Sequence, residues 1–297
     1  MKSSISFLLP TYNCECHALV GELHRQCERL RASHGLCYEI IVADDCSPDR
    51  SFVARNRRIE SLCHVRYLVR EHNVGRSAIR NVLAREARCE WLVFIDGDLQ
   101  VSRPDFVERY ARSSGDVVVG GVEIGGSPEA WRGNLRYRYE KSCEQAHSVG
   151  GSRRVGGRDF RTTNFLVSRA IALAVPFDEA FRRYGYEDVL FGKSLVEHGH
   201  EIVHIDNPIL LDDYEPNDVY MDKTEEACHT LREFAYSLQG YSRLLQCESR
   251  LRKLHVLWLM RLAFGVVGAA MRSSLVGSRP SVLVYNIYKL LYYVSRT

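Results

Sequence analysis

Two carboxylates separated by one residue follow a strongly apolar segment of the chain. Asp96 and Asp98 flank Gly97 directly after Trp91–Ile95. Carboxylates at this spacing can hold a hard divalent cation, directly or through water, and the cation can then bridge phosphate oxygens. Aspartate and glycine are also ordinary turn residues, so the motif alone does not separate a metal site from an acidic turn.

Two further polar clusters follow apolar segments, and both lie nearer the N-terminus. They are Pro10-Thr11-Tyr12 and Asp44-Asp45. The ring of Tyr12 is suited to stacking on a base, and a carboxylate of the second cluster can accept a hydrogen bond from a nucleobase or a ribose. The alternatives are a packing role for Tyr12 at the rim of the fold, and a solvated turn or helix cap for the two aspartates.

Three more candidates lie in the second half of the chain. Glu187 and Asp188 open a helix-like segment, where carboxylates interact favourably with the helix dipole. A carboxylate in that place could also serve as a general base if it faces a substrate hydroxyl. His204 ends an apolar segment and is a candidate metal ligand, with a purely structural histidine as the alternative.

The elements around these residues alternate between strands and helices. Strands are predicted at residues 5–9, 39–43, 65–69, 91–95, 117–119, 165–167 and 202–205. Helices are predicted at about residues 17–33, 51–62, 76–87, 105–113, 131–147 and 187–198. This alternation predicts βαβ units and a mainly parallel sheet, in which ligands bind beyond the carboxyl ends of the strands. The first three polar clusters are therefore expected to meet at one edge of the sheet.

The C-terminal part of the chain differs in charge from the rest. Residues 231–297 contain ten basic and two acidic residues, which gives a net charge of +8. We expect a long helix from about Asp218 to Leu245 and two more helical segments after it. The apolar run 256–271 is shorter than the roughly 20 residues that span a bilayer, and Arg261 interrupts it. A basic, amphipathic extension lying on an anionic membrane surface is predicted, with packing on the core or on a partner as the alternative.

Composition excludes several classes of protein. The chain has 297 residues, 45% of them hydrophobic, with 40 basic and 37 acidic residues. These values exclude a disordered or collagen-like chain, and a net charge of +3 does not by itself indicate nucleic-acid binding. The ten cysteines form no CxxC pair, and no secretory signal is evident before the first strand, so we expect a cytoplasmic protein with free thiols.

With these residues in place, the chain resembles the inverting family 2 glycosyltransferases with the GT-A fold. Five ordered segments within about residues 4–210 carry the resemblance: SFLLPTYN (6–13), IIVADDCS (40–47), NVGRSAIRN (73–81), WLVFIDGD (91–98) and YGYEDVLFG (184–192). The resemblance implies an α/β fold with a Rossmann-like mixed sheet flanked by helices. The expected catalytic domain is residues 1–217, divided into a nucleotide-sugar half to about 119 and an acceptor half from about 120. A helical extension at 218–297 lies outside the resemblance.

The resemblance implies a nucleotide pocket built from the first two matched segments. Tyr12 would stack on the base, and Pro10 and Thr11 would line the pocket beside it. Asp45 would accept a hydrogen bond from the base, and Asp44 would support Asp45.

The third and fourth segments imply the binding of the diphosphate and a metal. Arg76 or Arg80 would neutralise the diphosphate. Asp96 and Asp98 would form the DxD pair that contacts the nucleotide and holds Mn²⁺ or Mg²⁺, with Asp98 as the direct ligand.

The fifth segment implies the reaction itself. Asp188 would remove the proton from the acceptor hydroxyl, and Glu187 would bind or orient the acceptor. The acceptor oxygen would displace the nucleoside diphosphate, of which UDP is expected ahead of GDP, and the anomeric configuration would invert. The acceptor is expected to be a glycan or a lipid-linked glycan, on the cytoplasmic side with peripheral membrane contact; the oligomeric state stays open.

The sequence departs from the family pattern at two places. Cys46 stands where the family usually has glycine, which puts the geometry of that turn in doubt. The family often has a histidine where this chain has Leu210-Leu211-Asp212. A third metal ligand is therefore doubtful, with His204 and Asp212 as weaker candidates.

Other functions fit the sequence less well. A haloacid dehalogenase-like phosphatase would place threonine where Gln100 stands, and a dinucleotide oxidoreductase would need GxGxxG after the first strand. No nucleic-acid-reading module is evident. The main alternative is a catalytically silent sugar-nucleotide-binding or scaffold protein, and the retention of both Asp98 and Asp188 argues against it.

Overall fold

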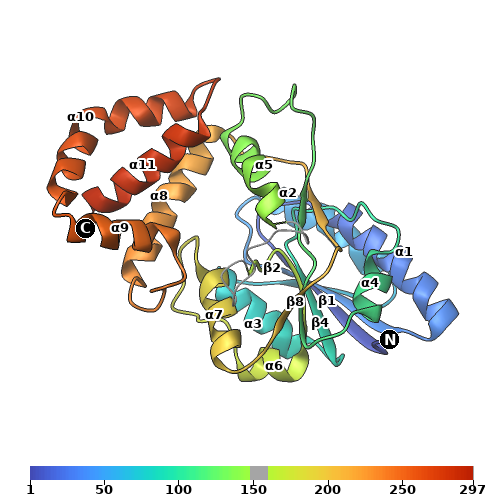
Figure 1. Ribbon diagram of the computed structural model, residues 1–297. Coiled ribbons are helices and arrows are strands. Elements are labelled where there is room, and N and C mark those ends of the chain that lie inside the picture. The colour runs from blue at the N-terminus through green and yellow to red at the C-terminus, as the bar shows by residue number, and fades with distance from the viewer. Residues whose placement is uncertain (148–159, 297) are drawn as a thin grey trace. The chain divides into compact units, whose positions relative to one another are not determined.

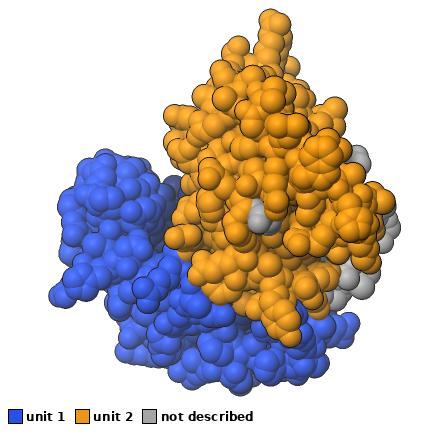
Figure 2. All heavy atoms as spheres, turned by 90° about the vertical axis from the view of Figure 1, so that its left-hand side faces the viewer, with its two compact units in different colours: residues 1–125, 145–182, 191–212 blue, residues 126–144, 183–190, 213–297 orange. Residues whose placement is uncertain are grey.

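The computed structural model describes residues 1–147 and 160–296, without the side chains of 145–147, and divides the chain into two compact units (Figures 1 and 2). The first unit contains residues 1–125, 145–182 and 191–212, and the second contains residues 126–144, 183–190 and 213–297.

A seven-stranded sheet forms the centre of the first unit. Its strands are β1 (Ser4–Thr11), β2 (Cys37–Asp44), β3 (Val65–Val69), β4 (Trp91–Ile95), β5 (Val117–Val119), β7 (Asn164–Ser168) and β8 (Ile202–His204). The strand order is β3-β2-β1-β4-β7-β5-β8, and β7 alone runs antiparallel to its neighbours. A separate parallel pair joins β6 (Val122–Ile124) to β9 (Ile209–Leu211). The mixed, mainly parallel sheet was predicted, whereas the short strands β6 and β9 were not.

Helices connect and cover these strands. In the first unit they are α1 (His17–His34), α2 (Arg50–Asn56), the 3₁₀ helix η1 (Arg57–Ser61), α3 (Arg76–Glu86), α4 (Phe106–Arg112) and α6 (Arg169–Ala174). Helix α7 (Glu187–Glu197) begins in the second unit and continues in the first. Helix α1 buries one stripe with the 3.6-residue period, which includes Leu19, Leu23 and Leu30, whereas α3 is buried on more than one face, including residues 77–81.

An aromatic cluster packs one part of this core. The rings of Phe94 and Phe165 stack on neighbouring strands with centroids 4.9 Å apart, and Phe177 stacks on Phe191 at 3.9 Å. All four side chains are buried. Such pairs add roughly 0.5–1.5 kcal/mol each to the free energy of burial, so this cluster fixes β4, whose C-terminal end carries the acidic pair.

The second unit is helical. It contains α5 (Leu135–His147) up to residue 144, α8 (Asn217–Glu233), α9 (Arg243–Lys253), α10 (Leu257–Val276) and α11 (Val282–Ser295). Helices α10 and α11 form a hairpin that packs on α8. Polar contacts lock this packing: Glu225 of α8 accepts hydrogen bonds from Arg272 Nε of α10 at 2.9 Å and from the Tyr288 hydroxyl of α11 at 2.7 Å.

Two predictions for the C-terminal region were wrong. The expected long helix to Leu245 ends at Glu233, because a turn region with Gly240 in a left-handed conformation follows, and Ser242 then caps the separate helix α9. The apolar run 256–271 was also predicted to be too short to span a bilayer, but all of it except Val256 lies in the 20-residue helix α10. Among the described residues, α10 alone is long and apolar enough to cross a bilayer, judged by length and composition.

Candidate active site

The predicted polar clusters of the first unit meet at the carboxyl edge of β1, β2 and β4. The Asp45 amide donates a hydrogen bond to the Thr11 carbonyl at 3.0 Å, and the Gly97 amide donates to the Pro10 carbonyl at 3.2 Å. The turn after β1 is thereby tied to the turns after β2 and β4. We call this group of strand ends the polar edge.

Gly97 is required by the close approach of two turns. A Cβ atom at this position would lie 2.5 Å from Thr11 Cγ2 and 3.0 Å from the Pro10 carbonyl oxygen. No side chain fits at the first of these distances without displacing its neighbour. Glycine between the two aspartates therefore allows this backbone to pack closely against the end of β1, just before Tyr12.

Arg80 of α3 is the most unusual side chain at the polar edge. It is 2% exposed, and its guanidinium donates a hydrogen bond to Asp96 Oδ1 at 2.6 Å. A buried arginine that pairs with a carboxylate fixes the position of that carboxylate. Arg80 was predicted as one of two alternatives for binding the diphosphate; here its partner is Asp96. Arg76, the other alternative, is exposed at the first turn of α3.

Asp44 and Asp45 are both buried, and their carboxylates hold backbone segments. Asp44 accepts hydrogen bonds from the Ser47 amide and hydroxyl. Asp45 accepts one from the Val74 amide and one from the Gly75 amide, both at 2.9 Å. Burial raises the pKa of Asp45, and these two amides act in the opposite direction. Each Asp45 oxygen keeps acceptor capacity beyond its backbone bond.

Two predicted site residues reach solvent at this edge. Tyr12 is 52% exposed, and Asp98 is exposed as well. Cys14 follows closely along the chain, but burial and the nearby carboxylates of Asp98, Asp96 and Asp44 raise its thiol pKa to about 12. Cys14 therefore stays neutral, and the ligand atoms presented here are carboxylate oxygens, which suit Mg²⁺ and Mn²⁺.

The turn that contains Cys46 keeps the backbone conformation that glycine favours. Cys46 has a φ angle of 62°, in the left-handed region, although it carries a side chain. Its thiol donates a hydrogen bond to the Glu71 carbonyl at 3.2 Å. The departure from the family pattern at this position thus changes the residue without changing the class of turn.

The predicted metal ligand His204 lies apart from the acidic pair in the sheet. His204 ends β8, which is three strands away from β4, or about 14 Å at the usual strand spacing. Within the described residues, Asp96, Asp98 and His204 are not among the groups that bring three ligand atoms within 4.8 Å. The structure therefore does not assemble this ligand set.

Asp212 lies closer to the acidic segment in strand register. Gln100 and Leu210 exchange two backbone hydrogen bonds as an antiparallel bridge, which aligns the chain at Asp98 with the chain at Asp212. The side-chain amide of Gln100 also donates hydrogen bonds to both carboxylate oxygens of Asp212, at 3.0 and 3.2 Å. The sequence does not predict this role of Gln100, because the role depends on pairing with a distant strand.

Glu187 and Asp188 begin α7 in the second unit, after a turn with two left-handed residues. Gly185 and Tyr186 have φ angles of 100° and 69°. A Cβ atom on Gly185 would lie 2.8 Å from Ala227 Cβ of α8, and Thr230 of α8 donates a hydrogen bond to the Tyr184 carbonyl at 2.9 Å. Strained backbone of this kind persists only where the surroundings hold it, so α8 positions both carboxylates. Glu187 is buried, and Asp188 is partly exposed.

Comparison with known families identifies the chain. The model described as glycosyl transferase family 2 matches residues 6–189. The chain therefore belongs to glycosyl transferase family 2, as the sequence motifs predicted. The match includes every predicted site residue except His204 and Asp212, the two weaker metal-ligand candidates.

Curated relatives match parts of the chain. An undecaprenyl-phosphate 4-deoxy-4-formamido-L-arabinose transferase of Pseudomonas paraeruginosa is 33% identical over 43% of this chain and 38% of its own length. An uncharacterized glycosyltransferase of Haemophilus influenzae is 33% identical over 32% of this chain and 29% of its own length. The chain thus matches well under two thirds of the length of these relatives.

Solved structures show the same fold at low sequence identity. The TarS 1–349 structure of S. aureus in complex with UDP-GlcNAc covers 100% of this chain and is itself covered to 91%, at 17% identity and a TM-score of 0.51. The mannosyltransferase PcManGT of Pyrobaculum calidifontis, in complex with GDP-Man and Mn²⁺, covers 98% of this chain and is covered to 86%, at 13% identity and a TM-score of 0.55. These likenesses confirm the predicted GT-A architecture.

Proposed function

We propose that this family 2 glycosyltransferase moves a sugar from a nucleoside-diphosphate sugar to a hydroxyl group of an acceptor, with inversion of configuration. The observation that carries the proposal is the polar edge, where Arg80 holds Asp96 and where the turn with Gly97 and Asp98 is hydrogen-bonded to the end of β1, just before Tyr12. Two carboxylates on a fixed strand end can hold a metal ion that binds a diphosphate, and the exposed aromatic ring beside them can stack on a nucleobase.

The residues at this edge divide the work of binding the donor. Tyr12 stacks on the base, beside Pro10 and Thr11. Asp45 shapes the loop at Val74 and Gly75 and uses its remaining acceptor capacity for the nucleotide. UDP is the expected nucleotide, ahead of GDP, on family frequency alone. Arg76 contacts the diphosphate, because Arg80 is committed to Asp96.

Asp96 and Asp98 would hold a divalent cation, Mn²⁺ or Mg²⁺. When bound, the cation neutralises charge on the departing nucleoside diphosphate. Arg80 keeps Asp96 oriented for this purpose. Asp212, aligned with Asp98 by the Gln100–Leu210 bridge, is a better third candidate than His204.

Asp188 is the proposed general base. Its carboxylate accepts the proton of the acceptor hydroxyl while the acceptor oxygen attacks the anomeric carbon and the bond to the diphosphate breaks. Glu187 orients the acceptor. The strained turn at Gly185 and Tyr186 sets the direction of both carboxylates.

A transfer assay tests the proposal. The protein is incubated with Mn²⁺, each of several UDP- and GDP-sugars, and glycan or lipid-linked acceptors, and the anomeric configuration of the product is read by NMR. Transfer with inversion supports the proposal. Retention of configuration would contradict the single displacement, and donor binding without transfer to any acceptor would favour the silent sugar-nucleotide-binding alternative.

We further propose that the second unit binds an anionic membrane surface through α10. Trp258, Leu262 and Val266 form one exposed stripe at i, i+4 and i+8, with 61%, 62% and 75% of their surface accessible. Leu283 and Ile287 expose the same kind of stripe on α11. Monomeric proteins rarely expose contiguous apolar patches of this kind, so the stripe indicates a binding face.

Charge and packing favour a helix that lies in the membrane plane. Five basic side chains are exposed on α9, on α10 and after α10, and such side chains are attracted to anionic headgroups: Arg250, Arg252, Lys253, Arg261 and Arg279. Arg272, near the C-terminal end of α10, pairs with Glu225 and Asp222 of α8. A spanning orientation of α10 would draw these ion pairs toward the hydrocarbon, at a cost that an in-plane orientation avoids.

Vesicle sedimentation tests the membrane proposal with the full chain. Binding to vesicles that contain phosphatidylglycerol, weaker binding to pure phosphatidylcholine, and release by high salt are expected. If the protein stays in the soluble fraction with both vesicle types, the proposal is contradicted. If the bound protein resists extraction by salt and alkali, α10 spans the membrane instead. A lipid-linked acceptor fits such a location.

A further inference from the structure

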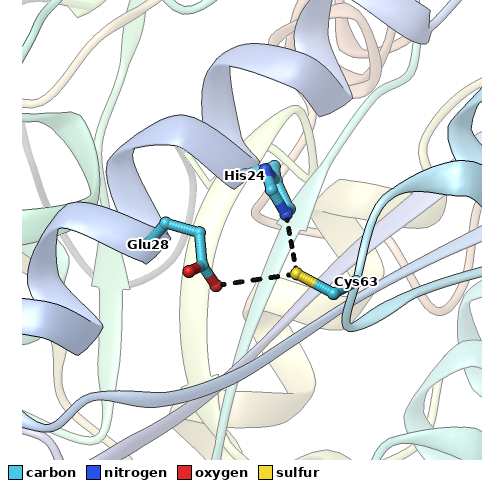
Figure 3. A group of neighbouring side chains, drawn as sticks. All are labelled: His24, Glu28 and Cys63. Atoms are coloured by element: carbon cyan, nitrogen blue, oxygen red, sulfur yellow. Dashed lines mark hydrogen bonds between the residues drawn. The ribbon is translucent and has the colours of Figure 1, made fainter.

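Three side chains of different chemistry converge on the surface of the first unit, in a group unrelated to the polar edge. His24 and Glu28 lie one turn apart on α1, and Cys63 lies in the turn between η1 and β3 (Figure 3). His24 Nε2 is 3.4 Å from Cys63 Sγ, and Cys63 Sγ is 3.9 Å from Glu28 Oε1. All three ligand atoms lie within 4.8 Å of one another.

These distances are close to the edges of a tetrahedral metal site. With zinc–sulfur and zinc–nitrogen bonds of about 2.3 and 2.0 Å, neighbouring ligand atoms lie about 3.5 Å apart. The nitrogen–sulfur distance already matches this value within about 0.1 Å. Because Cys63 is exposed and lies in a turn, a small rotation of its side chain can shorten the contact with Glu28.

Neighbouring residues prepare Glu28 to act as a ligand. The Tyr38 hydroxyl donates to Glu28 Oε1 at 2.5 Å, and Arg31 donates to both carboxylate oxygens. Arg31 first, and then Tyr38, lower the pKa of Glu28 to about 2, so the carboxylate is ionised at any physiological pH. Hydrogen bonds of this kind orient carboxylate ligands in metal sites.

The charge of the group also suits a dication. A Cys63 thiolate and Glu28 contribute two negative charges, and Arg31 offsets one of them. The imidazole of His24, which meets the Tyr38 ring edge-on at a centroid distance of 6.2 Å, adds a nitrogen donor without a negative charge. A divalent ion therefore meets a net charge of −1 and three donors of nitrogen, sulfur and oxygen type.

We propose that His24, Glu28 and Cys63 bind a thiophilic divalent metal of the zinc class, with water in the fourth position. Binding releases the thiol proton of Cys63 to solvent as the sulfur–metal bond forms. The ion links α1 to the turn before β3 and stabilises that end of the first unit. This site differs from the Asp96–Asp98 site, whose oxygen ligands favour Mg²⁺ or Mn²⁺ over soft-ligand metals.

Cobalt(II) titration of the reduced full chain tests this proposal. Co²⁺ bound to a thiolate gives an intense near-ultraviolet charge-transfer band, which a carboxylate site cannot produce. We expect this band in the wild-type protein at one equivalent, its loss on addition of Zn²⁺, and its persistence when Mg²⁺ is added in excess.

Matched variants assign the ligands. Cys63→Ser is expected to abolish the band, and His24→Ala to weaken Co²⁺ binding about 100-fold or more. Cys247→Ser, which removes another exposed free thiol, and Asp98→Asn are expected to leave the band unchanged. No band in folded wild-type protein, or a band that survives Cys63→Ser, would overturn the proposal.

Discussion

Charged side chains are usually exposed and apolar side chains are usually buried, and the two units depart from this rule in opposite ways. At the polar edge of the first unit, Arg80, Asp44 and Asp45 are charged and buried, and each has hydrogen-bonded partners. In the second unit, Trp258 and Leu262 are apolar and exposed. Both departures cost stability unless something compensates them. In the first unit the compensation is internal, whereas in the second we propose that a membrane surface supplies it.

This contrast agrees with the functions that we propose for the two regions. A site that orients a donor needs fixed groups, and the polar edge fixes them through ion pairs, amides and a glycine with no room for a side chain. A face that meets a lipid surface needs only an exposed stripe of the right polarity and charge. The predictions below test the two regions separately.

The largest effect is expected from Asp188→Asn. Removal of the proposed base should lower the rate of sugar transfer by about 10²- to 10⁴-fold, while donor binding stays within a factor of two or three. Initial rates and donor calorimetry measure the two quantities. An unchanged rate in Asp188→Asn would remove this residue from the mechanism, and Glu197→Gln on the same helix is the control.

The next effect concerns the buried ion pair of Arg80. Arg80→Met should lower the free energy of unfolding by about 3 kcal/mol, because Asp96 loses its partner. Loss of one partner of a buried ion pair costs about 3–5 kcal/mol, and the partial exposure of Asp96 keeps the loss at the low end of that range. Arg76→Met, at an exposed position, should lower the free energy of unfolding by less than Arg80→Met does and should weaken nucleotide binding. Urea unfolding and calorimetry separate these effects, and equal destabilisation by both variants would contradict the assigned roles.

A smaller loss is expected from Gly97→Ala. The new methyl group would meet the Thr11 side chain, so the free energy of unfolding should fall by about 2 kcal/mol, and binding of the metal nucleotide should weaken. Gly21→Ala, in α1 with open space around it, should instead stabilise the protein by up to about 1 kcal/mol. Thermal unfolding of the pair measures the difference.

A charge in the exposed apolar stripe of α10 should weaken vesicle binding about tenfold. Leu262→Asp should weaken binding to anionic vesicles by about tenfold without changing transfer to a soluble acceptor, because the residue contributes apolar burial only in lipid. Ala263→Asp on the flank of the stripe should have a smaller effect. A larger loss from the flank variant would mean that the stripe has been assigned to the wrong face.

The smallest effect is expected at Cys46. Cys46→Gly should change the free energy of unfolding by less than about 1 kcal/mol, since relief of the left-handed conformation is offset by greater chain entropy and by loss of the contact with Glu71. Cys46→Val should destabilise the protein by about 1–2 kcal/mol, since a branched side chain disfavours positive φ. Equal stability of the two variants would contradict the conformation assigned to this turn.

Local patterns predicted most of the first unit. The strands Val65–Val69, Trp91–Ile95 and Val117–Val119 were predicted with their observed bounds, because short apolar runs between turn residues leave little freedom. The meeting of three polar clusters at one edge followed from the direction of parallel strands. The family motifs then predicted membership in glycosyl transferase family 2.

The features that the sequence did not predict depend on distant contacts. The Gln100–Leu210 bridge and the pairing of β6 with β9 join segments about a hundred residues apart, and neither three-residue strand has a distinctive pattern. The pairing of Arg80 with Asp96 depends on how α3 packs on the sheet, which helical periodicity does not specify. The break between α8 and α9 was missed because Gly240 and Ser242 stand in an otherwise helix-compatible segment.

The most direct test of the central claim is calorimetric binding of nucleotides to the polar edge. UDP, GDP, CDP and dTDP are titrated with and without Mn²⁺ into the wild-type protein and Asp98→Asn. We expect one nucleotide, UDP first, to bind in a metal-dependent way, and Asp98→Asn to weaken that binding at unchanged thermal stability. Absence of binding by all four nucleotides, in folded wild-type protein, would contradict the account and leave Asp96-Gly97-Asp98 an ordinary acidic turn.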